Sequence, residues 1–322
     1  MTLQFIAAAG LGWPSSDWFV INTRFYLVLS AAVIIAEAVV RLAIVRPVSP
    51  FRYLSSPPVI QIAARRTSAL LPIAAVGLFM PAFSAMKSSI GRINPFAWDE
   101  TFIALDQAIH GTDPWRLLQP IMGHPIVSLI ASNLYHLWFA LIYLGPIVFA
   151  FYVRERRLRL TFFIGYFATW TVVGMVFATL LSSVGPCFVG PILGNQHFAE
   201  QMAYLHEADR IYPLAVLDVQ QLLLDWHRSA EGGFGRGITA MPSMHVALCW
   251  LYVLATWRID RRIGLAFFAF FVAIQLSSVH LAYHYAVDGY LSVLLVTAIW
   301  FACGKVAAAV GSPASNLGNP RR

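Results

Sequence analysis

The sequence predicts an all-α polytopic membrane protein, a bundle of six to seven transmembrane helices with extracytoplasmic interfacial helices. Hydrophobic residues make up 59% of the 322-residue chain and charged residues only 11%, and the mean hydropathy is +0.68. Soluble domains do not have this composition. Because about 17 to 25 apolar residues cross the hydrocarbon layer as a helix, each long apolar run is a candidate span.

Seven such runs occur along the chain. They lie near residues 24–45, 67–86, 126–152, 160–182, 243–257, 263–281 and 284–303. The fifth run is short and the last two are nearly contiguous, so a six-span arrangement with a tight re-entrant hairpin stays open. We expect residues 1–322 to form a single membrane domain that ends in a cytoplasmic tail at 304–322.

The formal charge of +7 is informative through its distribution, because basic residues gather on the cytoplasmic side of membrane proteins. With seven spans in place, 15 of the 22 basic residues and 3 of the 15 acidic residues fall on one side. This distribution predicts an integral inner or plasma membrane protein with an extracytoplasmic N-terminus and a cytoplasmic C-terminus. It gives no support to a nucleic-acid partner, and the oligomeric state stays open.

Two long segments, 87–122 and 183–242, fall on the extracytoplasmic side in this topology. In the first, an apolar face is predicted opposite an acidic one. The apolar set is Phe96, Trp98, Phe102, Leu105 and Ile109, and the acidic set is Asp99, Glu100 and Asp106. This pattern predicts an interfacial helix, with Trp98 and Trp115 as headgroup anchors. In the second segment, residues 212–228 have helical periodicity.

Four ionisable side chains are predicted at one depth on the extracytoplasmic side. His245 lies at the start of the fifth span, His280 at the end of the sixth, and His284 with Asp288 at the start of the seventh. Polar residues inside membrane helices are costly and usually face the bundle interior. Their convergence therefore predicts a functional site, into which the 183–242 segment leads.

The spacing of these residues suggests a chemistry. His284 and Asp288 are neighbours on one helical face at i and i+4, so the carboxylate can hold one ring nitrogen and leave the other as a nucleophile. His245 is then available as a general acid or base. Ser243 is a predicted helix N-cap, and Arg236 in the sequence EGGFGRG adds a positive charge. These groups suit a phosphoryl group.

At these residues the chain resembles the type 2 phosphatidic acid phosphatase (PAP2) superfamily of membrane phosphatases and lipid phosphotransferases. The second motif of that family is Pro-Ser-Gly-His, and this chain has Pro242-Ser243-Met244-His245. The third is Ser-Arg, five residues, His, three residues and Asp, which here is Ser277-Ser278 followed by His284 and Asp288. The first is Lys, six residues and Arg-Pro, which Lys87 and Asn94-Pro95 match loosely.

The resemblance implies that His284 is transiently phosphorylated, that Asp288 orients it and that His245 protonates the leaving group. It implies no metal and no cofactor. Met244, Ser278 and Asn94 depart from the three motifs, and the last two stand where the family has phosphate-binding arginines. The candidates to bind phosphate are Ser243, His280 and the basic side chains Lys87, Arg228 and Arg236.

The pattern without these arginines resembles the branch with the inositol phosphorylceramide synthases and sphingomyelin synthases. The implied reaction moves a phospho-head group from a phospholipid donor to a lipid alcohol such as ceramide or diacylglycerol. An alternative within the superfamily is a phosphatase acting on a lipid or polyprenyl phosphate, with water as the acceptor.

Two alternatives belong to other classes. His280, His284 and Asp288 at i, i+4 and i+8 form one stripe if the helix is continuous, and His245 would complete a zinc or iron site. The three cysteines, Cys187, Cys249 and Cys303, have no metal-site spacing. A proton-coupled transporter is the second alternative, although the paired broken helices typical of transporters are not evident.

Overall fold

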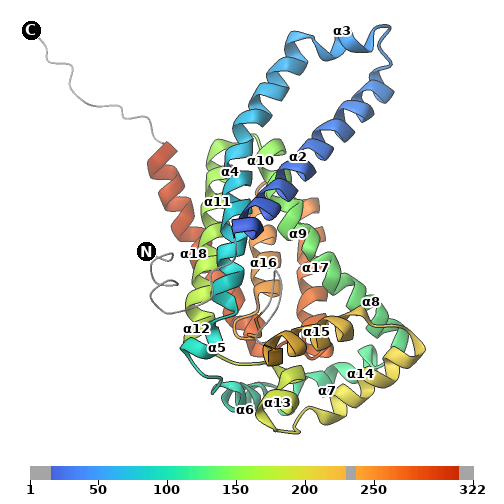
Figure 1. The fold of residues 1–322 in the computed structure, drawn as a ribbon, viewed down its shortest axis with the longest axis vertical. Helices are drawn as coiled ribbons and strands as arrows, with labels where there is room; N and C mark the ends of the chain where they lie inside the picture. The colour runs from blue at the N-terminus through green and yellow to red at the C-terminus, as the bar shows by residue number, and fades with distance from the viewer. Residues whose placement is uncertain (1–15, 230–236, 312–322) are drawn as a thin grey trace, which may run out of the picture. The chain divides into compact units, whose positions relative to one another are not determined.

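The computed structural model describes residues 16–229 and 237–311, and every regular element in these ranges is a helix (Figure 1). Six helices or helix pairs are long and apolar enough to cross a membrane. They are Phe19–Val45, Pro57–Lys87, Pro125–Tyr143, Arg156–Leu180, Arg261–His280 and Ala286–Val310. The predicted all-α polytopic membrane protein is confirmed.

The predicted fifth span is a shorter apolar helix, α16 (Met244–Thr256), of 13 residues. At 1.5 Å per residue it is about 20 Å long, less than the hydrocarbon thickness of roughly 30 Å. Most of its side chains are buried, including Val246, Leu248 and Leu251, each with no exposed area. A helix that is apolar and buried on all sides belongs in the middle of a bundle.

The described chain divides into two compact units, one formed by residues up to Met86 together with Phe139–Arg154. Its helices are α2 (Ser16–Val45), α3 (Pro50–Leu54), α4 (Pro57–Lys87), α9 (Phe139–Tyr143) and α10 (Gly145–Tyr152). A partly buried carboxylate, Glu37, accepts bonds from Arg41 Nε and the Tyr152 hydroxyl, both at 2.7 Å, and pairs with Arg66. These partners offset the cost of a charge on a membrane helix.

The second unit comprises Lys87–Trp138 and the described residues from Glu155 onward. Its long helices are α8 (Pro125–Leu137), α11 (Arg156–Thr171), α16, α17 (Arg261–His280) and α18 (Ala286–Gly311). A π-helical turn, η1 (Val172–Phe177), and α12 (Ala178–Leu180) extend α11. Helix α16 packs against α11, α17 and α18, and α11 also packs against α18. This bundle forms the core of the unit.

Short helices gather at the end of this bundle where α17 leads into α18 (Figure 1). We call them the short-helix group: α6 (Asp99–His110), α7 (Pro114–Met122), α13 (Pro186–Leu193), α14 (Ala199–Ile211) and α15 (Ala215–Ser229), with α5 (Ile90–Ile93) preceding them. Helix α15 confirms the predicted periodicity of residues 212–228. Helices α6, α7, α14 and α15 pack on α18, α17, α8 and α8, respectively.

In α6 the acidic residues Asp99 and Asp106 face the protein interior together with Phe102, and the rest of the predicted apolar face in this helix is exposed. Asp99 and Asp106 are 2% and 3% exposed, whereas Leu105 and Ile109 are 43% and 54% exposed. The two carboxylates face the bundle because backbone N–H groups there donate to them, those of Val184 and Gly185 to Asp99 and those of Ala286 and Val287 to Asp106. Of the two predicted anchors, Trp98 is exposed, whereas Trp115 is buried beneath the guanidinium of Arg116.

The five residues that join α17 to α18 are held by side chains of the short-helix group. Gln201 Nε2 donates to the carbonyls of Val279 and His280 at 2.8 and 3.1 Å, and Gln220 Nε2 donates to that of Leu281 at 2.9 Å. These carbonyls lie at the C-terminal end of α17, where no intrahelical partner exists. The group thereby fixes the path of the chain into α18.

Gly185 also contacts this junction. Its φ is +88°, and a Cβ there would lie 2.7 Å from the Tyr283 carbonyl oxygen and 2.9 Å from Ala240 Cβ. Both the backbone angle and the close approach require glycine.

We predict that Gly185→Ala lowers stability by about 2 to 5 kcal/mol, from the left-handed backbone and the steric overlap together. Gly111→Ala is the matched control, because φ is +76° there and no atom lies within 4 Å of the added methyl group. It should cost only the backbone contribution, about 1 to 2 kcal/mol. Thermal unfolding in detergent micelles measures both, and equal losses would contradict the steric argument.

Candidate active site

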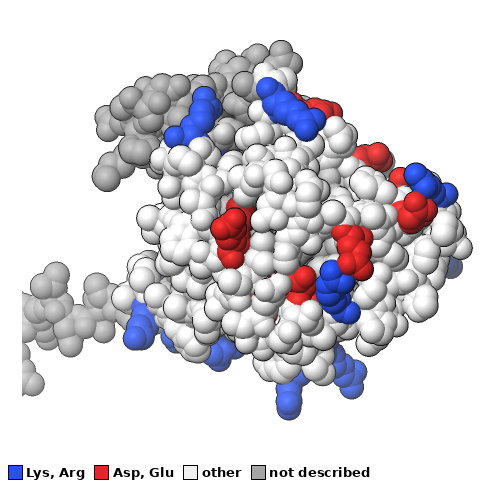
Figure 2. Space-filling view, turned by 90° about the horizontal axis from the view of Figure 1, so that it is seen from below, with Lys and Arg blue, Asp and Glu red and all other residues white. Residues whose placement is uncertain are grey.

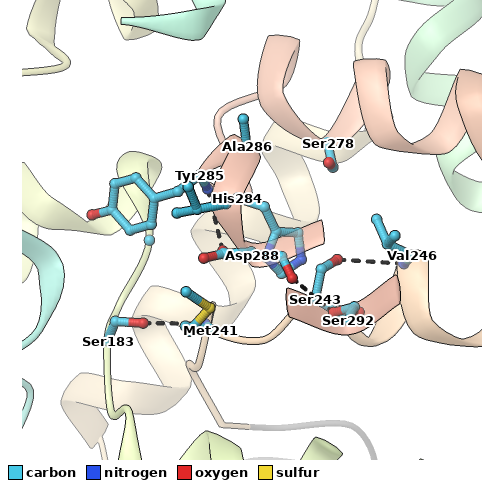
Figure 3. A network of polar contacts seen from close by, with 12 residues as sticks. Ser183, Met241, Ser243, Val246, Ser278, His284, Tyr285, Ala286, Asp288 and Ser292 are labelled. Carbon is cyan, nitrogen blue, oxygen red and sulfur yellow. Dashed lines mark hydrogen bonds and ion pairs between the residues drawn. The ribbon is translucent and has the colours of Figure 1, made fainter. Parts of the chain in front are cut away.

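His284 and Asp288 form a buried pair at the start of α18. Nδ1 of His284 lies 3.0 Å from Oδ2 of Asp288, and the Tyr285 N–H donates to the same oxygen at 3.2 Å (Figure 3). The side chains are 7% and 0% exposed. With Asp288 ionised, the carboxylate only accepts hydrogen bonds, so that Nδ1 of His284 carries the proton and Nε2 keeps its lone pair.

The surroundings of His284 favour a neutral ring. Burial lowers the pKa of His284 to about 3, and the positive charge of Lys87 acts in the same direction, while a backbone interaction with Ala240 partly opposes both. A neutral imidazole at neutral pH is the form that can act as a nucleophile.

His245 occupies the first turn of α16 and is enclosed by aromatic rings. Its ring centroid lies 4.1 Å from that of Tyr135 and 3.9 Å from that of Trp138, with interplanar angles of 16° and 29°. Tyr135 in turn stacks on Tyr283 at 4.8 Å. The centroids of His245 and His284 are 6.0 Å apart. The two imidazoles therefore lie within one cluster, although they are 39 positions apart in the sequence.

Backbone and serine groups join the start of α16 to the start of α18. The Ser243 N–H donates to the Asp288 carbonyl at 3.4 Å, and the Ser292 hydroxyl lies 2.9 Å from the Ser243 carbonyl and 2.7 Å from that of Asp288 (Figure 3). Ser243 Oγ accepts from the Val246 N–H at 3.4 Å, which confirms the predicted N-cap. These contacts tie the two histidine-bearing elements together.

Among the described residues, Lys87 is a cation whose positive charge acts on His284. It ends α4, and Gly237, with φ +104°, packs on its peptide group: a Cβ at Gly237 would lie 2.9 Å from the Lys87 carbonyl carbon. Ser278, at the position of the motif arginine, is fully buried and its hydroxyl donates to the Gln275 carbonyl at 2.8 Å.

The other predicted phosphate ligands lie elsewhere. His280 is buried with Nε2 2.9 Å from the Ser128 hydroxyl, which in turn lies 2.8 Å from that of Tyr204. Arg228 is exposed in the last turn of α15. Arg236 falls outside the described residues. The structure thus brings together His245, His284, Asp288, Ser243 and Lys87.

The metal hypothesis requires His280, His284 and Asp288 to lie on one continuous helix, and the structure does not have such a helix. Helix α17 ends at His280 and α18 begins at Ala286, with His284 in the junction. Among the described residues, no three His, Cys, Asp or Glu side chains are grouped as metal ligands.

Four residues at the site went unrecognised in the sequence: Tyr135, Trp138, Asp99 and Asp106. Tyr135 and Trp138 lie three positions apart, but an aromatic pair on a membrane helix usually packs against other helices or lipid. Asp99 and Asp106 gave a clearer signal, since acids at i and i+7 share one side of a helix. On an apolar segment, such a pair indicates donors opposite.

The face at the short-helix end is mostly uncharged. Figure 2 shows few and scattered charged side chains there. Arg116 lies 2.6 Å from Glu200, and Arg210 lies 2.7 Å from Glu207. On the part of this face that the structure describes, no broad basic surface of the kind that binds nucleic acids is present.

A family model of the PAP2 superfamily matches residues 100–302, more than half of the chain. The match includes Ser243, His245, His284 and Asp288 and begins after Lys87. No curated protein and no solved structure matches the chain. The extent of the family match, together with the apolar helices around a His-Asp pair, shows that the chain belongs to the PAP2 superfamily of membrane phosphatases and lipid phosphotransferases.

Proposed function

We propose that the protein transfers a phospho-head group from a phospholipid to a lipid alcohol through a phosphohistidine intermediate. The observation that carries this proposal is the His284–Asp288 pair, 3.0 Å apart, with the His245 ring centroid 6.0 Å from that of His284. Attack requires a phosphorus about 3 to 3.5 Å from the nucleophile, and proton donation requires a leaving oxygen about 3 Å from the acid. Rings at this separation suit one phosphoryl group between them.

In the first step, the Nε2 lone pair of His284 attacks phosphorus and forms an N–P bond. The bond from phosphorus to the lipid oxygen breaks, and His245 gives its proton to the departing alkoxide. A bound anionic phosphate favours the protonated form of His245. Asp288 holds Nδ1–H throughout and stabilises the positive charge that develops on the ring.

In the second step, the acceptor hydroxyl gives its proton to His245 and attacks phosphorus. The N–P bond breaks and its electron pair returns to Nε2 of His284. The acceptor is therefore selected separately from the donor. A ceramide or diacylglycerol hydroxyl gives transfer, whereas water gives hydrolysis. The burial of His284 and Asp288 and the aromatic rings around His245 favour a lipid alcohol, because they limit the entry of water.

Positive charge is sparse among the described residues of the site, which supports a phosphodiester donor. A phosphate monoester carries a charge of about −1.5 to −2 at neutral pH, whereas a diester carries one negative charge. Ser278 stands where the motif has an arginine, and among the described residues Lys87 is a cation whose charge acts on His284. The N-terminal N–H groups of α16, next to Ser243, add a partial positive charge. The limited positive charge near His284 matches the single negative charge of a diester. This match favours the inositolphosphotransferase-like branch over a lipid or polyprenyl phosphate phosphatase.

The distribution of basic residues supports an extracytoplasmic active site in the inner or plasma membrane. His245 and His284 lie at the ends of α16 and α18 that are joined to the short-helix group, and the basic-rich ends of the spans lie at the opposite termini of those helices, as Arg258 and Lys305 illustrate. The donor and acceptor would then come from the extracytoplasmic leaflet.

His284→Ala should abolish acid-labile labelling of the protein by phosphatidylinositol carrying ³²P, because it removes the nucleophile. Asp288→Asn should slow labelling by about 10²-fold or more, because it no longer holds the reactive tautomer. Acid and alkaline quenching of purified protein in detergent micelles measures both. Normal label on the His284→Ala protein would refute the role of His284, and turnover in micelles separates an enzyme from a transporter.

His245→Ala should slow labelling from the lipid donor by about 10²- to 10⁴-fold, the usual contribution of a general acid. With a 4-nitrophenyl phosphodiester of the same head group the loss should be less than about tenfold, because 4-nitrophenolate leaves without a proton. His206→Ala, an exposed histidine of α14, is the matched control and should change neither rate. Equal losses with both donors would contradict an acid role.

Lys87→Met should lower kcat/KM for the lipid donor by about 10- to 100-fold, since a charged hydrogen bond to phosphate contributes about 1.5 to 3 kcal/mol. The control is Lys305→Met, because Lys305 is the other lysine of the chain and lies near the far end of α18. Initial rates over a range of donor concentrations measure the effect. Equal kcat/KM for the two variants would exclude Lys87 from phosphate binding.

A further inference from the structure

Helix α6 carries two buried acids that the proposed reaction does not use. Asp99 and Asp106 are 2% and 3% exposed and lie seven positions apart on one side of the helix. Burying a carboxylate is costly unless donors satisfy it. The partners of these two acids therefore identify what α6 holds.

Asp106 binds the first turn of α18. Its Oδ2 accepts from the Ala286 N–H at 2.8 Å, and its Oδ1 accepts from the Val287 N–H at 3.0 Å. The first N–H groups of a helix have no partner within the helix, and a carboxylate is well suited to them because the helix dipole is positive there. Asp288, which holds His284, is the next residue after Val287.

Asp99 binds the residue that directly follows His284 and also the segment that precedes α13. Its Oδ1 accepts from the Gly185 N–H at 3.0 Å and from the Tyr285 hydroxyl at 2.8 Å, and its Oδ2 accepts from the Val184 N–H at 3.0 Å. Tyr285 directly follows His284. Asp99 thus joins the segment beside Gly185 to the residue next to the proposed nucleophile.

The two acids together bind the chain on the C-terminal side of His284. Asp99 binds Tyr285, and Asp106 binds Ala286 and Val287, so three consecutive residues between His284 and Asp288 contact α6. A shift of this segment would change both the His284–Asp288 hydrogen bond and the distance to His245. Misplacement by about 1 Å can cost about 10²-fold in rate.

We propose that Asp99 and Asp106 are positioning residues for phosphoryl transfer, which act by holding residues 285–287 so that His284 meets Asp288 and the substrate. The proposal rests on the proposed function. Helix α6 is then a part of the catalytic apparatus, although none of its side chains touches the reacting atoms.

Asp106→Asn tests the proposal, because an amide retains one acceptor oxygen but presents N–H groups to a backbone N–H. We expect the rate constant of acid-labile labelling from ³²P-phosphatidylinositol to fall about 10- to 100-fold, with the final amplitude of label and KM unchanged within about twofold. Glu100→Gln, which removes an exposed charge from the same helix, is the control and should leave rate and amplitude unchanged.

A purely structural role has a different signature. It would lower the amplitude, because fewer molecules are folded, and leave the rate constant of the remaining ones unchanged; that result overturns the proposal. If Asp106→Asn does not fold, Tyr285→Phe removes one hydrogen bond to Asp99 and keeps the ring, and its rate constant should fall severalfold at full amplitude. An unchanged rate constant for Tyr285→Phe also overturns the proposal.

The wild-type protein provides the separate check on the proposed function. Wild-type protein that takes up no acid-labile label overturns the phosphohistidine mechanism, and the positioning role with it. If the wild-type protein is labelled and the Asp106→Asn variant is labelled with the same rate constant, the positioning role alone is overturned.

Discussion

The structure depends on one constraint, that the buried peptide groups between α17 and α18 must find hydrogen-bond partners. Water cannot supply them there, and an unpaired peptide group costs several kcal/mol in an apolar environment. Gln201 and Gln220 satisfy carbonyls at the end of α17, the Cys187 N–H donates to the Ala282 carbonyl at 2.8 Å, and Asp106 satisfies the first N–H groups of α18. The segment that bears His284 is thus shaped by four helices from distant parts of the chain.

The same constraint explains why the short-helix group exists. A connection of five residues between two membrane helices cannot hydrogen-bond all of its own peptide groups, so other elements must bring donors and acceptors to it. Helices α6, α13, α14 and α15 each carry at least one such group. His284 and Asp288 are buried at this junction, so the same arrangement provides rigidity and limits the access of water, both of which the proposed transfer to an alcohol requires.

Local sequence patterns predicted much of this protein because their physical causes are local. Long apolar runs become membrane helices whatever surrounds them, since the bilayer leaves a single chain segment no other way to satisfy its backbone. Ser243 caps α16 through the N–H of Val246, three residues away. His284 and Asp288 meet because four residues make about one helical turn. The burial of Asp99 and Asp106 in α6 was not predicted, because hydrophobic periodicity carries no information about distant hydrogen-bond donors.

The sequence by itself therefore determined the membrane-spanning character, the helical class, the family and the His-Asp pair, all of which follow from composition or from spacings shorter than one or two helical turns. Tertiary structure alone decided that Tyr135 and Trp138 enclose His245 and that α6 holds residues 285–287. These contacts join residues up to 186 positions apart. Their reason is the pairing of buried polar groups, which depends on which segments meet in the folded chain.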